Sequence, residues 1–578
     1  MMHRIDTRGK GFSSIRTKRT LTLQGRRITS IIALLNSMTF LPTTMMRRRS
    51  CIPELPGILR ATTRRVSFLP NLPFGSTDAS SSRFVRSAFH SLRRLPPLLS
   101  NTVTYNIDFF AVEKRKRHFT TSLSDAVAEN RNIRSYDSHY INGEWTSQST
   151  NGTINVINSN NGKTVATIPA GTEDDTIKAI QAAKKALFEW KNTRPSERWH
   201  YMNNFVQHLE SKVDKIVDRL SVELGCTKHF ARNVQIMAAI SQIRTILDLL
   251  DNDGKVDIGN PEFEWEYATG TNTVVREPIG VVGTITPWNY PLYQIVLKII
   301  PALLAGCTVV LKPSEITPLS AYTFAEAMDE IDLPKGVFNM VQGTGPSCGE
   351  VLAKHPDVDL VSFTGSTRVG KILRGVAANS GTLKDIRTEL GGKSASILLD
   401  DANFRRFVPT YVKHVTSNTG QSCNALSRML VPRDRYEEVL EIAAKAMEKE
   451  IVGCAFTNPD ATIGPIVSED QYNVVRSYIQ KGITEGARIV TGGLDPPKGT
   501  EGSGGYFVKP TLFACTNDAT IAQEEIFGPV LCVIPYDTEE EAIKLANDTQ
   551  YGLNNAVASR DLRRALNVAS KLQSGVVG

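Results

Sequence analysis

Cys423 is the residue in this chain whose type and setting best suit covalent chemistry. It lies in the polar turn SNTGQSCNAL, with Gly420 and Gln421 just before it. A thiol in such a turn could be exposed, and nearby backbone N–H groups could favour its thiolate form. A lone cysteine is more often a small, inert apolar residue. The segments around Cys423 must therefore decide between the two interpretations.

Those segments predict an α/β protein. Around 139–171, β-branched residues alternate with Asn-Gly turns, as in hairpins, and a helix capped by Thr172 follows. From Val281 the short apolar stretches VVGTIT, TVVLKPS, VFNMV and VDLVSFTG alternate with helical patterns. This rhythm indicates a parallel sheet covered on both faces, with ligands bound in the loops after the strands. A second α/β unit is expected from Gly392 to the end of the chain.

Six short motifs fall in the predicted loops. They are TPWNYP (286–291), LKPSE (311–315), FTGST (363–367), ELGGKS (389–394), GQSCNA (420–425) and EEIFGPV (524–530). Each is a weak signal alone, but in this order and at these spacings they resemble the NAD-dependent aldehyde dehydrogenase family, over about 140–578. The resemblance implies a Rossmann-like cofactor domain at 135–391, with an oligomerisation hairpin near 257–279. It also implies a catalytic α/β domain at 392–578, whose end we expect to be truncated because an apolar strand begins at the final SGVVG.

The chemistry of aldehyde oxidation explains the need for a thiol. Hydride loss from a trigonal aldehyde would leave an acylium-like carbon, whereas a covalent thiohemiacetal avoids it. The resemblance makes Cys423 the nucleophile and Asn289, with the backbone N–H of Cys423, the oxyanion donors. It makes Glu389 the base that activates water against the thioester and Lys298 a helper in proton relay. Acylating relatives, which use coenzyme A, commonly lack this glutamate.

The resemblance also implies a set of binding residues. Expected at the NAD site are Thr286, Pro287, Trp288, Lys312, Ser314, Glu315, Gly345, Phe363, Thr364, Gly365, Ser366, Leu390, Gly391, Glu525 and Phe527. The Glu315 carboxylate can accept from both ribose hydroxyls and would repel a 2′-phosphate, which favours NAD over NADP. Expected around the substrate are Tyr290, Gln294, Leu297, Ser422 and Asn424, a largely apolar set without a charge partner. We therefore expect a generalist for aliphatic or aromatic aldehydes, with a betaine-aldehyde or semialdehyde specialist as the alternative.

Charge is distributed unevenly along the chain. The whole chain has 67 Lys and Arg residues and 59 Asp and Glu residues. The first 110 residues hold 18 of the basic residues but only 4 of the acidic ones, so the remainder is mildly acidic. The Arg- and Ser-rich extension 1–134 is typical of a transit segment, which predicts the mitochondrial matrix. A plastid, the cytoplasm, a disordered tail or a later start at Met45 or Met46 are the alternatives. The basic KRKR at 114–117 lacks interleaved aromatics, and no apolar run reaches the length of about 20 residues that a membrane span needs.

The cysteine and histidine patterns argue against disulfide-linked and metal-binding proteins. The eight cysteines show no CxxC spacing and the nine histidines no ligand cluster, so we expect neither disulfides nor a metal. A thiol hydrolase is a poor alternative, because His414 has no hydrolase motif around it. The main competing hypothesis is a catalytically silent or incomplete subunit, which lacks the C-terminal loop that closes the substrate tunnel and the strand used in oligomerisation. For an active protein the family implies a homodimer or homotetramer, a small aldehyde as partner, and no nucleic acid.

Overall fold

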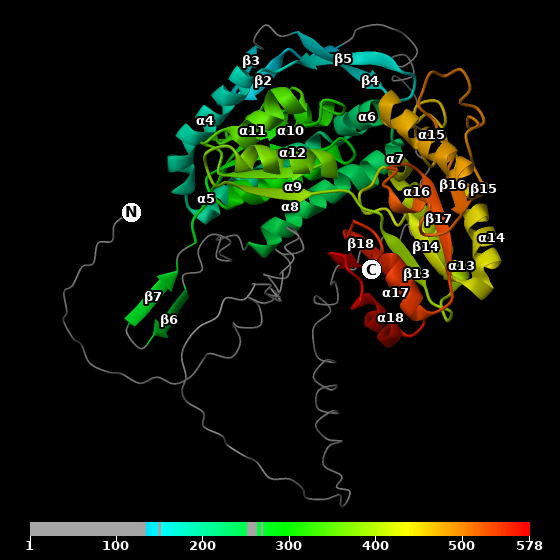
Figure 1. The fold of residues 1–578 in the computed structure, drawn as a ribbon. Helices are drawn as coiled ribbons and strands as arrows, with labels where there is room; N and C mark the ends of the chain where they lie inside the picture. The colour runs from blue at the N-terminus through cyan, green and yellow to red at the C-terminus, as the bar shows by residue number, and fades with distance from the viewer. Residues whose placement is uncertain (1–133, 148–151, 251–262, 268–269, 275) are drawn as a thin grey trace, which may run out of the picture. The chain divides into compact units, whose positions relative to one another are not determined.

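The computed structural model describes residues 134–147, 152–250, 263–267, 270–274 and 276–578. All described residues belong to one compact unit, Thr120–Gly578. The extension expected at 1–134 thus lies outside the described residues except for Arg134. Figure 1 shows the element order along the described part of the chain.

A seven-stranded sheet, in the order β12-β11-β8-β9-β10-β2-β3, forms the first half of this unit. Its parallel strands are β8 (Val281–Ile285), β9 (Thr308–Lys312), β10 (Phe338–Met340), β11 (Leu360–Thr364) and β12 (Asp385–Glu389). Strand β2 (Ser138–Ile141) pairs antiparallel with β10, and β3 (Glu144–Ser147) pairs antiparallel with β2. Every residue of β8 and β9 is buried, as parallel strands covered on both faces require. The predicted Rossmann-like α/β fold is confirmed.

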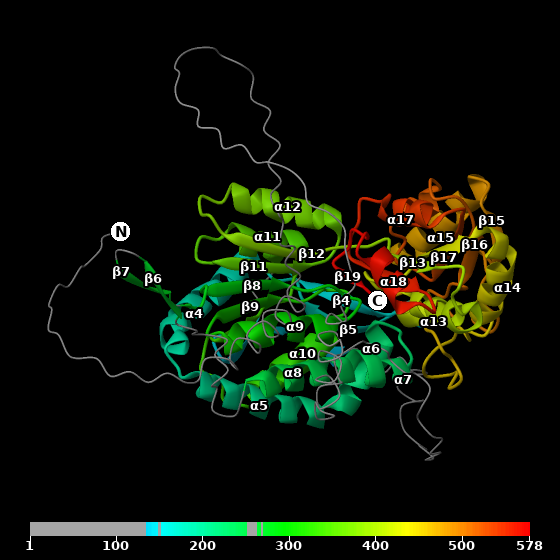
Figure 2. The same cartoon turned by 90° about the horizontal axis from the view of Figure 1, so that it is seen from below.

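Helices cover both faces of this sheet, as Figure 2 shows. On one side lie α11 (Glu350–Lys354) and α12 (Thr367–Ala378), and on the other α5 (Pro195–Ser211), α8 (Met237–Leu249), α9 (Pro291–Leu304) and α10 (Leu319–Asp329). Helix α4 (Glu173–Lys191) shares the core of the first side through Ile180. It begins as predicted at Thr172, whose side chain accepts the Asp175 N–H in a reciprocal capping box. Helix α6 (Val213–Glu223) packs against α10.

A second seven-stranded sheet, in the order β15-β16-β17-β14-β13-β18-β19, forms the second half. Its strands are β13 (Ala395–Leu398), β14 (Arg428–Pro432), β15 (Arg488–Thr491), β16 (Thr511–Ala514), β17 (Val530–Tyr536), β18 (Asn554–Ala558) and β19 (Val576–Val577). All neighbours are parallel except β15 and β16. One face packs on α13 (Phe404–Thr416) and α14 (Tyr436–Met447). The other packs on α15 (Glu469–Thr484), α16 (Thr520–Gln523), α17 (Glu539–Asn547) and α18 (Leu562–Ala569).

Two small sheets complete the described part of the chain. One joins β1 (Arg134–Ser135), β5 (Lys163–Pro169) and β4 (Thr153–Asn158). The other is a two-stranded antiparallel pair of β6 (Phe263–Tyr267) and β7 (Gly270–Val274). This pair falls within the range 257–279 in which a hairpin was expected. Its part in oligomerisation, like the domain boundary at 391/392, stays a prediction.

The polarity of the two large sheets decides where the motifs lie. TPWNYP, LKPSE, FTGST and ELGGKS follow the carboxyl ends of β8, β9, β11 and β12, as expected. GQSCNA and EEIFGPV instead precede the amino ends of β14 and β17, and ELGGKS also leads into β13. The expectation that chemistry follows strands therefore holds for the first sheet only. Within the described residues, no helix is long and apolar enough to cross a membrane.

Candidate active site

Backbone segments from distant motifs approach so closely that only glycine fits between them. A Cβ on Gly420 would lie 2.1 Å from the carbonyl carbon of Gly528, which joins GQSCNA to EEIFGPV. A Cβ on Gly392 would lie 2.4 Å from the carbonyl oxygen of Cys423, which joins ELGGKS to GQSCNA. Real Cβ atoms do not approach backbone atoms this closely, so both positions require glycine. Three motifs that begin at positions 389, 420 and 524 thus form one site.

The turn before Cys423 has a left-handed backbone. Asn418, Thr419 and Gly420 have φ values of 52°, 55° and 75° in succession. For the two residues with a Cβ this conformation costs about 1–2 kcal/mol each, so the surroundings must hold it. Thr419 Oγ1 donates to the Gly464 carbonyl at 3.0 Å, and the Gln421 amide Nε2 donates to the Asn418 carbonyl at 2.9 Å. The turn that carries Cys423 is therefore a strained segment held by specific contacts.

Asn289 contacts this turn directly. Its Nδ2 donates to the carbonyl oxygen of Gln421 at 3.0 Å, and only 4% of the residue is exposed. A backbone oxygen can only accept, so the atom that faces it must be the nitrogen of the amide. One amide hydrogen is used in this bond and the other is left for a further acceptor. This arrangement suits the predicted role of Asn289 as an oxyanion donor.

Cys423 is not activated in this structure, contrary to the expectation from its polar turn. The residue is partly exposed, but the pKa of its thiol is raised from the ordinary 9.0 to about 11. Burial of the thiol is the largest cause, and the charges of Glu525 and Glu389 add to it. The backbone N–H groups of Cys423 and Asn424 do lower the pKa, as predicted, but their effect is smaller. Desolvation and two carboxylates thus outweigh the backbone donors.

Glu389 and Lys298 influence each other across the gap between β12 and α9. Burial raises the pKa of Glu389, and the Lys298 ammonium partly offsets this. Burial lowers the pKa of Lys298 to about 8, and the charges of Glu389 and Cys423 work in the opposite direction. A carboxylate with a raised pKa beside an amine with a lowered one is suited to proton transfer near neutral pH.

The first sheet presents groups that fit a dinucleotide. Lys312, which is 4% exposed, and Glu315 form an ion pair of 2.6 Å directly after β9. Thr286 Oγ1 is buried without a hydrogen-bond partner among the described residues, so a bound ligand could satisfy it. The Ser366 side chain caps α12 by accepting the Val369 N–H. The other expected residues of this sheet lie in the same loops or just beside them: Pro287, Ser314, Gly345, Phe363, Thr364, Gly365, Leu390 and Gly391.

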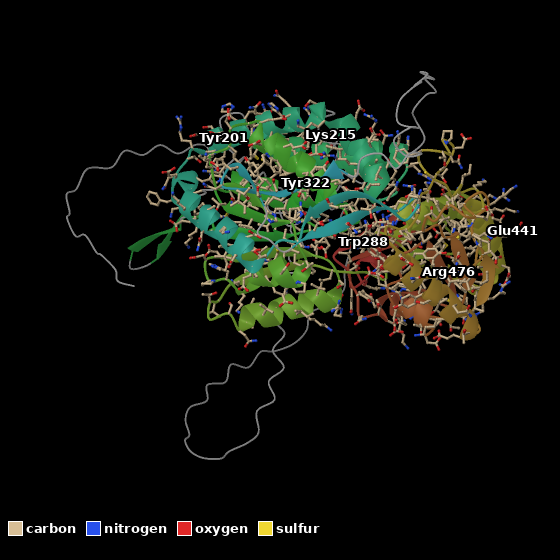
Figure 3. All side chains as sticks on the ribbon, turned by 90° about the horizontal axis from the view of Figure 1, so that it is seen from above. Tyr201, Lys215, Trp288, Tyr322, Glu441 and Arg476 are labelled. Atoms are coloured by element: carbon tan, nitrogen blue, oxygen red, sulfur yellow. The ribbon has the colours of Figure 1, made fainter. Side chains whose placement is uncertain are left out.

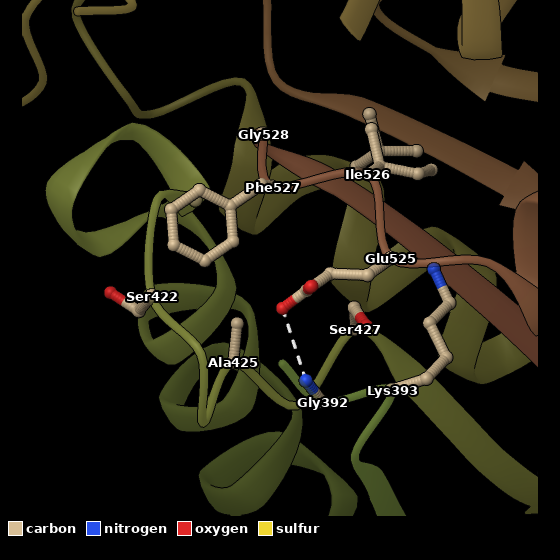
Figure 4. Close-up of a pocket in the computed structure, with 11 residues that line it drawn as sticks. Gly392, Lys393, Ser422, Ala425, Ser427, Glu525, Ile526, Phe527 and Gly528 are labelled. Atoms are coloured by element: carbon tan, nitrogen blue, oxygen red, sulfur yellow. Dashed lines mark hydrogen bonds between the residues drawn. The ribbon is translucent and has the colours of Figure 1, made fainter. Parts of the chain in front are cut away.

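Glu525 and Phe527 complete the site from the second sheet. Glu525 Oε1 accepts the Gly392 N–H at 3.0 Å, as Figure 4 shows, in a small pocket also lined by Lys393 and Ser422. Burial raises the pKa of Glu525, and the Gly392 N–H lowers it. The Phe527 ring meets Trp288 edge-on, with centroids 5.2 Å apart. Trp288 lies at the border between the two halves in Figure 3.

The expected substrate residues fall into two groups. The Tyr290 hydroxyl and Ser422 Oγ are hydrogen-bonded at 2.8 Å, which brings the TPWNYP loop to the residue beside Cys423. Leu297 is partly exposed on α9, and Asn424 is exposed. Gln294 lies instead beside the cofactor residues, where its Oε1 accepts from Thr364 Oγ1 at 3.3 Å.

Several residues that shape the site were not found from the sequence. Phe230 lies with its ring centroid 6.4 Å from that of Tyr290. The Glu223 carboxylate, at the end of α6, accepts the Leu319 N–H at 2.6 Å and so caps α10 behind the LKPSE loop. Gln235 donates from Nε2 to the Asn289 carbonyl at 2.9 Å. The sequence offers no local signal for these contacts, because each joins residues more than 50 positions apart.

Comparison with known proteins identifies the family. The family model described as "Aldehyde dehydrogenase family" matches residues 145–578. The chain belongs to the aldehyde dehydrogenase family. A 3-succinoylsemialdehyde-pyridine dehydrogenase from Pseudomonas sp. is 44% identical over 447 residues, which cover 77% of this chain and 91% of that relative.

Solved structures of aldehyde dehydrogenases share the fold. A mutant of aldehyde dehydrogenase C from Pseudomonas syringae, complexed with NAD+ and octanal, is 40% identical with a TM-score of 0.72; the match covers 76% of this chain and 88% of that one. The Mycobacterium tuberculosis aldehyde dehydrogenase complexed with NAD+ is 39% identical with a TM-score of 0.73, and the match covers 77% and 90%. The family resemblance inferred from the six motifs is confirmed.

Proposed function

We propose that this aldehyde dehydrogenase oxidises an aldehyde to a carboxylic acid through a thiohemiacetal and a thioester on Cys423. The observation that carries the proposal is the hydrogen bond from Asn289 to the turn of the nucleophile, with Glu389 and Lys298 beside it. Bound NAD supplies the hydride acceptor. Lys312, Glu315, Thr286 and Ser366 would hold it on the first sheet, and Glu525 and Phe527 on the second.

The side chains divide the chemical steps between them. The Cys423 thiolate attacks the carbonyl carbon, and the developing oxyanion accepts hydrogen bonds from Asn289 Nδ2 and the Cys423 backbone N–H. Loss of hydride from this carbon leaves the thioester. Glu389 then takes a proton from water, the hydroxide attacks the thioester carbon, and the C–S bond breaks to release the acid and the thiolate.

The resting pKa of Cys423 has a consequence for this sequence of steps. A thiol with a pKa of about 11 must lose its proton during the reaction, either to a base or through a change in its surroundings. Glu389 is the candidate base, because its pKa is raised and its charge acts on the thiol. In this proposal Glu389 serves twice, first on the thiol and later on water.

The substrate is an uncharged aliphatic or aromatic aldehyde. The expected substrate residues are aromatic, apolar or neutral polar, and Phe230 adds a further aromatic ring near Tyr290. The octanal in the Pseudomonas syringae complex and the pyridine-containing semialdehyde named for the 44% identical relative support this class. A semialdehyde specialist is the narrower alternative. We further propose that the protein is a homo-oligomer of the mitochondrial matrix.

Cofactor reduction by the purified chain tests the proposal. Absorbance of NADH is followed with a panel of aliphatic, aromatic, betaine and semialdehyde substrates. Glu389→Gln should form the thioester more slowly than the wild type and should not turn over, and Cys423→Ala should abolish both thioester formation and turnover. Full turnover by Cys423→Ala would overturn the mechanism. No NADH with any aldehyde would favour the alternative of a catalytically silent subunit.

A further inference from the structure

The main-chain carbonyl of Asn289 is held by two buried side-chain amides. Gln235 Nε2 and Asn418 Nδ2 both donate to it at 2.9 Å. Gln235 is fully buried, and Asn418 is 5% exposed. Burial of a primary amide is costly unless it is hydrogen-bonded, so two of them on one carbonyl represent a specific arrangement.

Gln235 reaches this carbonyl from an unusual backbone segment. It lies in the π-helix η3 (Ala231–Ile236), which runs directly into α8. Single turns of π-helix shift the direction of the side chains that follow and occur often at functional sites. Gln235 Oε1 is buried without a hydrogen-bond partner among the described residues. An amide kept only for stability would be expected to satisfy both ends, whereas here only the end that meets Asn289 is bonded.

The Asn418 amide closes a small network with the turn of the nucleophile. Its Nδ2 also donates to the Gln421 carbonyl at 3.1 Å, the same oxygen that accepts from Asn289 Nδ2 at 3.0 Å. The backbone carbonyl and the side-chain amide of Asn289 are therefore both fixed relative to the Cys423 turn. Gln235 and Asn289 come from the first half of the protein, whereas Asn418 and Gln421 come from the second.

We propose that Gln235 is a positioning residue that sets the direction of the oxyanion donor, Asn289. By holding the carbonyl of residue 289, it fixes the backbone from which the donating side chain extends. The inference rests on the proposed function, because that proposal makes Asn289 the donor to the oxyanion that forms when Cys423 attacks a carbonyl. It predicts that loss of the Gln235 amide impairs every attack of Cys423 on a carbonyl and leaves other reactions of the thiol unchanged.

The test compares Gln235→Met with a matched control on α8. Methionine has a similar length but donates no hydrogen bond. The control is Gln242→Met, because Gln242 Nε2 is buried without a partner among the described residues. The cofactor-free reaction with 4-nitrophenyl acetate forms the C–S bond, breaks the ester C–O bond and releases 4-nitrophenolate, so it needs the oxyanion donor. Alkylation of Cys423 by iodoacetamide forms no oxyanion and reports the thiol alone.

Gln235→Met should lower the ester burst rate and the dehydrogenase kcat by about tenfold. Loss of a whole oxyanion donor costs about 10²–10³, and here Asn418 still holds the carbonyl. The KM and the alkylation rate should stay within about twofold, and Gln242→Met should match the wild type in every assay. Equal burst rates in the wild type and Gln235→Met would overturn the inference, as would a parallel loss of burst and alkylation.

A second variant covers the case in which Gln235→Met does not fold. Asn418→Asp keeps a residue that tolerates the left-handed backbone but replaces the donor by a carboxylate that accepts. It should reduce the ester burst more than the alkylation rate, and an unchanged burst would contradict the network. A different result would refute the proposed function alone. If the wild type shows the ester burst but reduces no cofactor, aldehyde oxidation is refuted and the role of Gln235 is left intact.

Discussion

Replacement of Glu525 by glutamine should make Cys423 react faster with an alkylating reagent at pH 8. The thiol pKa is raised to about 11, mainly by burial and then by the charges of Glu525 and Glu389. Glutamine has nearly the same shape as glutamate but carries no charge. The variant therefore removes the second largest cause and leaves the burial of the thiol unchanged.

The structure limits the size of the effect. The rise from 9.0 to about 11 reduces the thiolate fraction at neutral pH by about a hundredfold, or about 3 kcal/mol. Burial is the largest cause and stays in both variants, so removal of one carboxylate should restore only part of this hundredfold. Glu525→Gln should thus accelerate alkylation at pH 8 by between about threefold and tenfold, and Glu389→Gln by somewhat less.

The assay is the rate of iodoacetamide alkylation between pH 6.5 and 10, without cofactor or aldehyde, with the modified residue identified by mass spectrometry. In the wild type the rate at Cys423 should rise about tenfold per pH unit over the whole range, because the thiol titrates above it. Cys454, which is partly exposed in another part of the chain, serves as the internal reference. Its rate should be the same in the wild type and in both variants.

Two results would refute the reasoning. If the wild-type rate at Cys423 levels off below pH 8, the resting thiol is already ionised and the dominance of burial is wrong. If Glu525→Gln slows alkylation while Cys454 reacts as before, the carboxylate assists the thiolate instead of opposing it.

Three further predictions concern the same site. Lys298→Met should move the acidic limb of the pH profile of kcat to higher pH by up to about one unit. The Lys298 ammonium lowers the pKa of Glu389, and kcat rises as that base loses its proton. An unchanged pH profile would contradict this. Gly420→Ala should prevent folding or reduce activity more than about a hundredfold, since its Cβ would lie 2.1 Å from a backbone carbon. The control is Gly486→Ala, which has a similar φ of 85° but lies in open space. It should lower the free energy of thermal or urea unfolding by only about 1–2 kcal/mol. Glu315→Gln should raise the ratio of kcat/KM for NADP over NAD by about tenfold, because it removes the charge that would repel a 2′-phosphate, and an unchanged ratio would show that another group discriminates.

Local sequence patterns predicted the elements of the fold well. The capping of α4 at Thr172 and the β-α alternation from Val281 depend on residues within a few positions of each other, and both are present in the structure. The contacts that build the site were beyond such patterns. Gln235 and Asn289 are 54 positions apart, and nothing near either residue indicates their hydrogen bond. The pKa of Cys423 was also misjudged, because burial is a property of the folded chain and not of the turn.

The position of the two sheets explains why the site needs both halves of the protein. The carboxyl ends of parallel strands in the first sheet supply Asn289, Lys312 and Glu389, whereas the amino ends in the second supply Cys423 and Glu525. In the proposed mechanism, hydride can pass only if the carbon bound to sulfur faces the acceptor, so Cys423 and the expected cofactor residues must meet across this border. Gly392 and Gly420 allow the backbone segments around Cys423 to approach closely enough. A bulkier residue at either position would displace the turn that carries Cys423 from the residues of the first sheet, so activity should be lost.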